Sequence, residues 1–110
     1  MDQLKELEQK VEFYDFVSED FMAPDCPFSY SIPEIRQEID DLLIIITPDS
    51  KSLMRLNRAD RDIIAFIDNL PDDYDEDDPN QPFERWWWHL KAIKEDRFPR
   101  KFLPKLQDKA

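Results

Sequence analysis

Apolar side chains recur at intervals of three and four residues along the first part of the chain. This spacing places them on one face of an α-helix. Phe13 and Phe16 lie beside the stripe and widen it. Asp2 is suited to cap the helix, and the helix is expected to stop before Pro24, because proline disfavours helical geometry in the preceding residue. The pattern predicts a first helix over residues 2–22, with the stripe Leu4, Leu7, Val11, Tyr14, Val17 and Phe21.

The second apolar stripe has the clearest start in the chain. Ser31 and Glu34 have the spacing of a capping box, and a proline stands between them in the first turn. The helix is expected to end at Thr47 and Pro48. Because residues 42–47 are rich in β-branched side chains, a strand there is the alternative. The capping box and the helical period favour a helix with the stripe Ile35, Ile39, Leu42, Leu43 and Ile46.

A third helical region is predicted over residues 49–70, and Pro71 ends it. Asp60 interrupts its apolar face, and the pair Asn57 and Asp60 offers an alternative start for a new helix. The stripe consists of Leu53, Leu56, Ile63, Ile67 and Leu70.

The last part of the chain is expected to add a fourth helix and a tail. Pro82 opens a helix from about residue 83 to 95, with Asn80 or Gln81 near its cap. The predicted fold is therefore all-α, with about four helices in a small compact bundle or an orthogonal array and a Pro-containing C-terminal strap. An α/β fold with a strand near 42–47 is the alternative. The strap's apolar residues are Phe98, Phe102, Leu103 and Leu106.

The length of 110 residues suits one domain over 1–110. The chain has no glycine, which disfavours a hairpin-rich sheet and a phosphate-binding loop, since both rely on it. A single cysteine, Cys26, forms no internal disulfide, and the longest apolar run, Leu42 to Ile46, is too short to span a membrane. A cytoplasmic location is the resulting expectation.

The net charge of −11 is unevenly distributed. Residues 1–84 carry 23 acidic and 7 basic side chains, a net charge of −16, whereas residues 85–110 have a net charge of +5. The acidic body is expected to repel nucleic acid and anionic membranes and to attract a basic protein surface or a basic tail. The basic tail over 96–110 is expected to pack on the acidic domain.

Residues 72–78 hold six carboxylates in seven positions. Such a run is typical of a solvated loop that attracts a basic partner. An EF-hand is the competing interpretation, with Asp73, Asp75, Asp77 and Glu84 at ligand positions. Its sharp turn requires glycine where this chain has Asp78, so no metal site is predicted. The predicted partner-binding carboxylates are Asp72, Asp73, Asp75, Glu76, Asp77 and Asp78.

Three consecutive tryptophans follow the acidic run. Successive residues of a helix point about 100° apart, so Trp86 and Trp87 are expected to share the core face, and Trp88 projects to one side. Trp88 is then either covered by the C-terminal strap or exposed as an interface anchor. We predict Trp88 as the aromatic member of the partner-binding site.

Catalysis and cofactor binding have no support in the sequence. His89 is the only histidine and has no ligand partner at zinc-site spacing. A nucleophilic pair of Cys26 and His89 lacks any local motif. We therefore predict no enzyme activity and no cofactor.

These features predict a small acidic, non-catalytic protein–protein interaction module: an adaptor, assembly factor or inhibitor that binds a basic partner protein. Two alternatives stay open. One is a decoy that mimics the charge of nucleic acid, such as an antitoxin, an immunity protein or an anti-nuclease protein. The other is a calcium-responsive binding protein that uses the acidic run.

Overall fold

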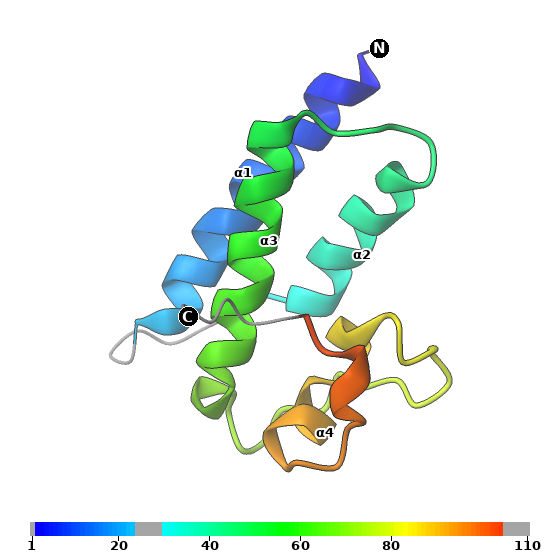
Figure 1. The fold of residues 1–110 in the computed structure, drawn as a ribbon. Coiled ribbons are helices and arrows are strands. Elements are labelled where there is room, and N and C mark those ends of the chain that lie inside the picture. The colour runs from blue at the N-terminus through cyan, green and yellow to red at the C-terminus, as the bar shows by residue number, and fades with distance from the viewer. Residues whose placement is uncertain (1, 24–29, 105–110) are drawn as a thin grey trace.

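Three long helices form the body of the protein in the computed structural model, which describes residues 2–23 and 30–104. They are α1 (Gln3–Met22), α2 (Ile32–Leu43) and α3 (Ser50–Ala65). Figure 1 shows α2 running opposite to α1 and α3. No strand occurs in the described residues, so the predicted all-α fold is confirmed and the alternative strand over 42–47 is not formed.

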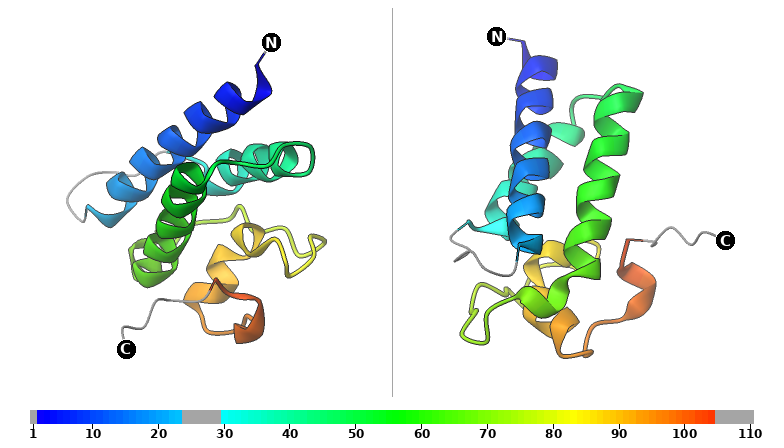
Figure 2. Two further views of the ribbon diagram at one scale, coloured as in Figure 1. Left: turned by 45° about the horizontal axis from the view of Figure 1, so that its top comes forward. Right: turned by 90° about the vertical axis from the view of Figure 1, so that its left-hand side faces the viewer.

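The second half of the chain closes one end of these three helices (Figure 2). It consists of one short helix and single turns of 3₁₀-helix joined by loops. The short helix is α4 (Leu90–Lys94), and the 3₁₀ turns are η1 (Ile67–Asn69), η2 (Trp86–Trp88) and η3 (Arg100–Phe102). None of the helices in the described residues has both the length and the apolar character needed to cross a membrane.

Side-chain caps set the starts of the long helices. The Asp2 carboxylate accepts the backbone N–H groups of Leu4 and Lys5 at 3.1 and 3.3 Å. The Ser31 hydroxyl accepts the N–H of Glu34 at 3.4 Å, as the sequence predicts for α2. Asp49 caps α3, which continues through Asp60 without a break, so the alternative helix start at Asn57 and Asp60 is wrong.

The helix ends depart from the sequence pattern. The second helix stops at Leu43, and Ile44 and Ile45 lie exposed in the turn that follows. The predicted helix over 83–95 is wrong in its first half, because residues 86–88 form a 3₁₀ turn and α4 begins only at Leu90. The apolar pattern of the sequence does not determine where these helices end, because contacts with residues far away in the chain decide which turns are stabilised.

The described residues share one hydrophobic core, to which every long helix contributes. Trp86 and Trp87 are buried in it, as predicted. From the predicted strap, Phe98 is buried, and Phe102 and Leu103 are half-buried against the core. Residues 105–110 lie outside the described residues. The largest fully buried side chains are Tyr14, Phe21, Leu7, Ile32, Ile39, Ile63 and Leu90.

A buried polar network crosses this core. Arg36 of α2 donates to Asp60 of α3 through Nε to Oδ1 at 3.0 Å and through Nη2 to Oδ2 at 3.2 Å. The Tyr14 hydroxyl of α1 donates to the same Asp60 Oδ1 at 2.5 Å. The Arg36 guanidinium also lies 4.3 Å from the ring centroid of Trp87. One network therefore joins the three long helices to η2, and the residue that interrupts the apolar face of α3 is its centre.

Burial and charge shift the titration of this network. Burial raises the pKa of the Tyr14 phenol, and the neighbouring Asp60 carboxylate raises it further. Burial also raises the pKa of Asp60, although the Arg36 guanidinium opposes that rise. Both rises are expected, because burial disfavours the ionised form of an acid and a nearby opposite charge offsets only part of that effect.

Removing one member of the network should be costly. We expect Asp60→Ala to lower the free energy of unfolding by about 3–5 kcal/mol, because it leaves the Arg36 charge buried without its partner. The combined change Arg36→Met and Asp60→Leu should cost much less. Arg55→Ala, which breaks a more exposed ion pair with Asp15, should cost less than about 1 kcal/mol. Urea unfolding followed by tryptophan fluorescence measures all three; equal costs for Asp60→Ala and Arg55→Ala would contradict the assignment.

The end of α4 adopts a backbone conformation that usually requires glycine. Asp96 has a φ of 60°, in the left-handed region. The N–H of Arg97 bonds the Ala92 carbonyl at 2.8 Å, and the N–H of Asp96 bonds the Ile93 carbonyl at 3.0 Å. This pair of bonds is a Schellman motif, whose left-handed position glycine fills best.

Asp96→Gly should therefore stabilise the protein by up to about 1 kcal/mol, because glycine reaches this conformation without a Cβ clash. Asp96→Ala should destabilise it, since alanine keeps the clash and loses the polar side chain. Thermal unfolding of both variants tests the expectation. A lower melting temperature for Asp96→Gly than for the natural chain would show that the strain at Asp96 is compensated elsewhere.

Candidate functional site

The acidic run forms a loop at the end of the molecule closed by the second half of the chain. Most of its carboxylates are already bonded inside the domain. Asp77 has the clearest structural role: its two oxygens accept the backbone N–H groups of Lys91 and Ala92 at 2.9 and 3.1 Å. These are free donors at the start of α4, so a side chain distant in sequence caps this helix in place of Asn80 or Gln81.

Three further carboxylates of the run also have internal partners. Asp72 accepts a hydrogen bond from Lys94 Nζ at 3.1 Å. Glu76 accepts the Ser31 hydroxyl at 2.6 Å, which ties the loop to the start of α2. Asp78 accepts the N–H of Asn80 at 3.0 Å. These bonds make the run a structural loop as well as a charged one.

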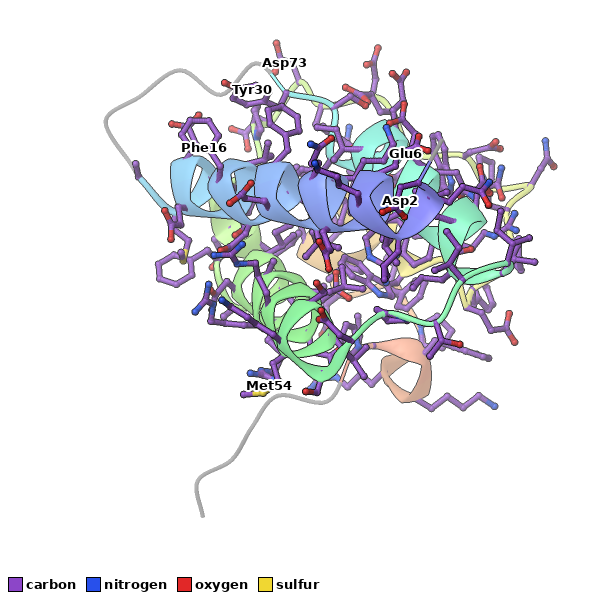
Figure 3. All side chains as sticks on the ribbon, turned by 90° about the horizontal axis from the view of Figure 1, so that it is seen from above. Asp2, Glu6, Phe16, Tyr30, Met54 and Asp73 are labelled. Carbon is purple, nitrogen blue, oxygen red and sulfur yellow. The ribbon has the colours of Figure 1, made fainter. Side chains whose placement is uncertain are left out.

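Asp73 and Asp75 differ from the other four carboxylates. Both are exposed, and within the described residues neither forms a hydrogen bond or an ion pair. Figure 3 shows Asp73 at the surface beside Tyr30. Their charges are therefore not compensated by any partner among the described residues.

These two residues border a hollow of about 220 Å³ between the loop and the start of α2. Apolar and aromatic side chains supply part of the lining, and Asp73, Asp75 and Glu76 supply carboxylates. We call it the acidic hollow. Its full lining is Tyr30, Ile32, Leu70, Pro71, Asp73, Tyr74, Asp75 and Glu76.

The sequence analysis indicated none of the uncharged residues of the acidic hollow as binding residues, and Tyr74 is one of them. Its hydroxyl is buried and has no hydrogen-bond partner among the described residues. Burial raises the pKa of the Tyr74 phenol, and the carboxylates of Glu76, Asp77 and Asp75 raise it further. An aromatic residue inside a run of six carboxylates was the available indication, because such a side chain tends to pack inward and fix the loop.

Trp88 lies apart from the acidic hollow but contacts the same helix. Its indole N–H donates to Gln37 Oε1 at 2.8 Å, and Trp87 donates to the same oxygen at 3.1 Å. Its backbone carbonyl accepts the N–H of Asp78 at 2.8 Å. The side chain is half-buried against the core. Its expected role as an interface anchor stays a prediction.

The described residues contain no group of three or more His, Cys, Asp or Glu side chains that could hold a metal ion. Of the proposed EF-hand ligands, Asp77 is already engaged in capping α4, and Glu84 is exposed in the turn before η2. His89 is buried, and its Nε2 lies 2.9 Å from the Gln81 carbonyl oxygen. Cys26, its hypothetical nucleophilic partner, lies outside the described residues.

The chain matches no protein-family model, and no curated protein or solved structure is significantly similar to it. The functional argument therefore depends on the geometry of the site itself.

Tyr74→Phe should change stability only at high pH. An unfolded tyrosine loses its proton near pH 10, whereas the folded chain holds it. The unfolding free energy should thus fall as pH rises above about 10, by at most about 1.4 kcal/mol per pH unit for this group. Partial exposure reduces that contribution. Tyr74→Phe should flatten the fall and leave neutral stability almost unchanged, because the hydroxyl has no partner.

Tyr14→Phe is the matched comparison. It should also flatten the alkaline fall, but it should cost about 1–2 kcal/mol at neutral pH, because it removes the hydrogen bond to Asp60. Urea unfolding of both variants at pH 7, 10 and 11 measures the difference. An unchanged alkaline slope for Tyr74→Phe would mean that this phenol ionises in the folded protein.

Proposed function

We propose that this protein is a non-catalytic protein–protein interaction module that binds a basic segment of a partner protein. The acidic hollow is the observation that carries the proposal. It combines an apolar and aromatic lining with two exposed carboxylates that have no internal partner. A lysine or arginine side chain has the matching chemistry, since its apolar stem packs on apolar surface while its charged end stays at a polar rim.

Different residues of the acidic hollow would contact the apolar stem and the charged end of a basic side chain. The more accessible lining residues Tyr30, Pro71 and Tyr74 would contact the stem of a basic side chain. Asp73 and Asp75 would pair with its charge. A cation held near a tyrosine ring also gains an electrostatic attraction to the ring face. The proposal uses no proton transfer and no covalent chemistry.

The charge of the whole molecule favours the same class of partner. A net charge of −11 attracts a basic segment over the Debye length, which is about 8 Å at physiological salt. Long-range attraction mainly accelerates association, and it weakens as salt is added. The bonds that hold Glu76 to Ser31 and Asp77 to α4 keep the loop in one arrangement before a partner arrives. Such preorganisation reduces the entropy lost on binding.

Neutralising the two free carboxylates should weaken binding without affecting the fold. We expect Asp73→Asn with Asp75→Asn to raise the Kd for an octalysine peptide about five- to tenfold at low salt, because each exposed pair contributes up to about 1 kcal/mol. Association should slow, and its salt dependence should flatten. Asp77 is left unchanged in this variant because it caps α4. Surface plasmon resonance at several salt concentrations gives the rates.

Glu19→Gln with Glu84→Gln is the matched control. Both residues are exposed, both lie outside the acidic hollow, and the change removes the same net charge. If the control weakens octalysine binding as much as the change at Asp73 and Asp75, the peptide responds to total charge alone. The acidic hollow would then not be the binding site.

A further inference from the structure

Two aromatic side chains on the outer face of α1 are exposed to solvent although they pack against each other. Phe13 is 45% exposed and Phe16 is 53% exposed. Their ring centroids lie 6.4 Å apart, and Tyr30 packs edge-on against both, at 5.7 and 6.2 Å. We call these three residues the aromatic cluster. Exposed aromatic residues gathered in this way are typical of a contact surface, since large aromatic side chains contribute much of the affinity at interfaces.

A groove continues from the aromatic cluster along α1 and α2. It has a volume of about 270 Å³, and Phe13 and Ile35 supply its apolar lining. Its polar lining is Glu6, Gln9, Lys10 and Glu38. Glu38 is paired across the two helices with Lys10 at 2.8 Å, so this lysine does not present a free positive charge. From Glu6 to Phe16, α1 extends about 15 Å, the length of roughly three helical turns.

Tyr30 connects the groove to the acidic hollow. It packs against Phe13 and Phe16 on one side, and it lines the acidic hollow on the other. In Figure 3, where the molecule is seen from above, Phe16, Tyr30 and Asp73 follow one another at one edge of the molecule. An apolar surface and an acidic surface are therefore continuous, and a single segment of a partner can reach both.

We propose that the groove and the aromatic cluster bind a short amphipathic helix of the partner protein, with its basic residues over the acidic hollow. This inference rests on the proposed function and specifies its ligand. Two neighbouring antiparallel helices form a groove that accommodates a third helix, whose apolar residues at positions i, i+3, i+4 and i+7 insert as anchors. The apolar face of the partner helix covers Phe13, Phe16 and Ile35, and its lysines or arginines meet Asp73 and Asp75.

Charge favours a basic amphipathic helix in the groove over a second copy of the chain or an anionic membrane. A second copy of the chain carries the same net charge of −11 and is repelled. A membrane surface with anionic lipids is repelled for the same reason. A helix with basic flanks is attracted both by Glu6, which lines the groove, and by the free carboxylates of the acidic hollow. Complementary charge also sets the orientation of the helix in the groove.

The test uses a 15-residue peptide of leucine and lysine with leucines on one helical face. A second peptide of the same composition, with leucines distributed around the helix, is the control ligand. Calorimetry should give a Kd at least tenfold lower for the amphipathic peptide. Phe13→Ala with Phe16→Ala should raise that Kd about 30-fold, the loss that removal of an aromatic anchor typically causes. Phe66→Ala, at a residue 43% exposed beyond the end of α3, should change it less than twofold.

Circular dichroism checks that each variant keeps its helices. If the double phenylalanine variant unfolds, Phe16→Ala alone replaces it. Amide chemical shifts of the natural chain then provide a second measurement: addition of the amphipathic peptide should move Phe13, Phe16 and Ile35 and leave Phe66 in place. Movement confined to residues elsewhere would overturn the groove as the binding site.

The outcomes separate this inference from the proposed function. If the phenylalanine changes have no effect while Asp73→Asn with Asp75→Asn weakens binding, the helix groove is wrong and the basic-segment function stands. If only the phenylalanine changes weaken binding, the groove stands and recognition by the acidic hollow is wrong. If both peptides bind equally, the amphipathic ligand is wrong. If neither peptide binds, both proposals are wrong.

Discussion

The paired bond between Arg36 and Asp60 is the interaction on which the rest of the structure depends. It is buried, it receives the Tyr14 hydroxyl, and it faces the ring of Trp87, so it joins all three long helices and the second half of the chain. A buried ion pair adds little stability compared with apolar residues of the same shape, but leaving one partner unpaired is costly. Its effect is therefore to favour the arrangement of the helices in which the two charges are paired.

That arrangement determines where the surface features lie. With α2 fixed against α1 and α3, the start of α2 brings Tyr30 between the acidic hollow and the two phenylalanines of the aromatic cluster. Further along α2, Gln37 accepts both indole N–H groups of Trp87 and Trp88 and holds the tryptophan turn. The acidic run over residues 72–78 is anchored at Ser31 by Glu76 and at α4 by Asp77. The proposed binding surface is thus supported by the same helix that carries Arg36.

The carboxylates of the acidic run fall into two groups, those bonded within the domain and those without an internal partner among the described residues. Repulsion between six neighbouring carboxylates opposes a compact loop. Four of them are compensated by backbone N–H groups, a hydroxyl or a lysine. The two that are not, Asp73 and Asp75, flank Tyr74 at the surface. Asp77 caps α4, whereas Asp73 and Asp75 have no partner among the described residues. For this reason the proposed recognition of a basic segment uses Asp73 and Asp75.

The sequence by itself determined the helical class, the three long helices and the caps at Asp2 and Ser31, because periodicity and capping act within one or two turns of the chain. It also located the acidic loop and the burial of Trp86 and Trp87. Tertiary structure alone decided that Asp60 belongs to the core, since a charge is tolerated there only beside Arg36. It likewise decided that α4 starts at Leu90, because Asp77 reaches that helix from 14 positions earlier. Bonds between residues far apart in sequence leave no periodic pattern, and so the acidic hollow, built from 30–32 and 70–76, appears only once the chain is folded.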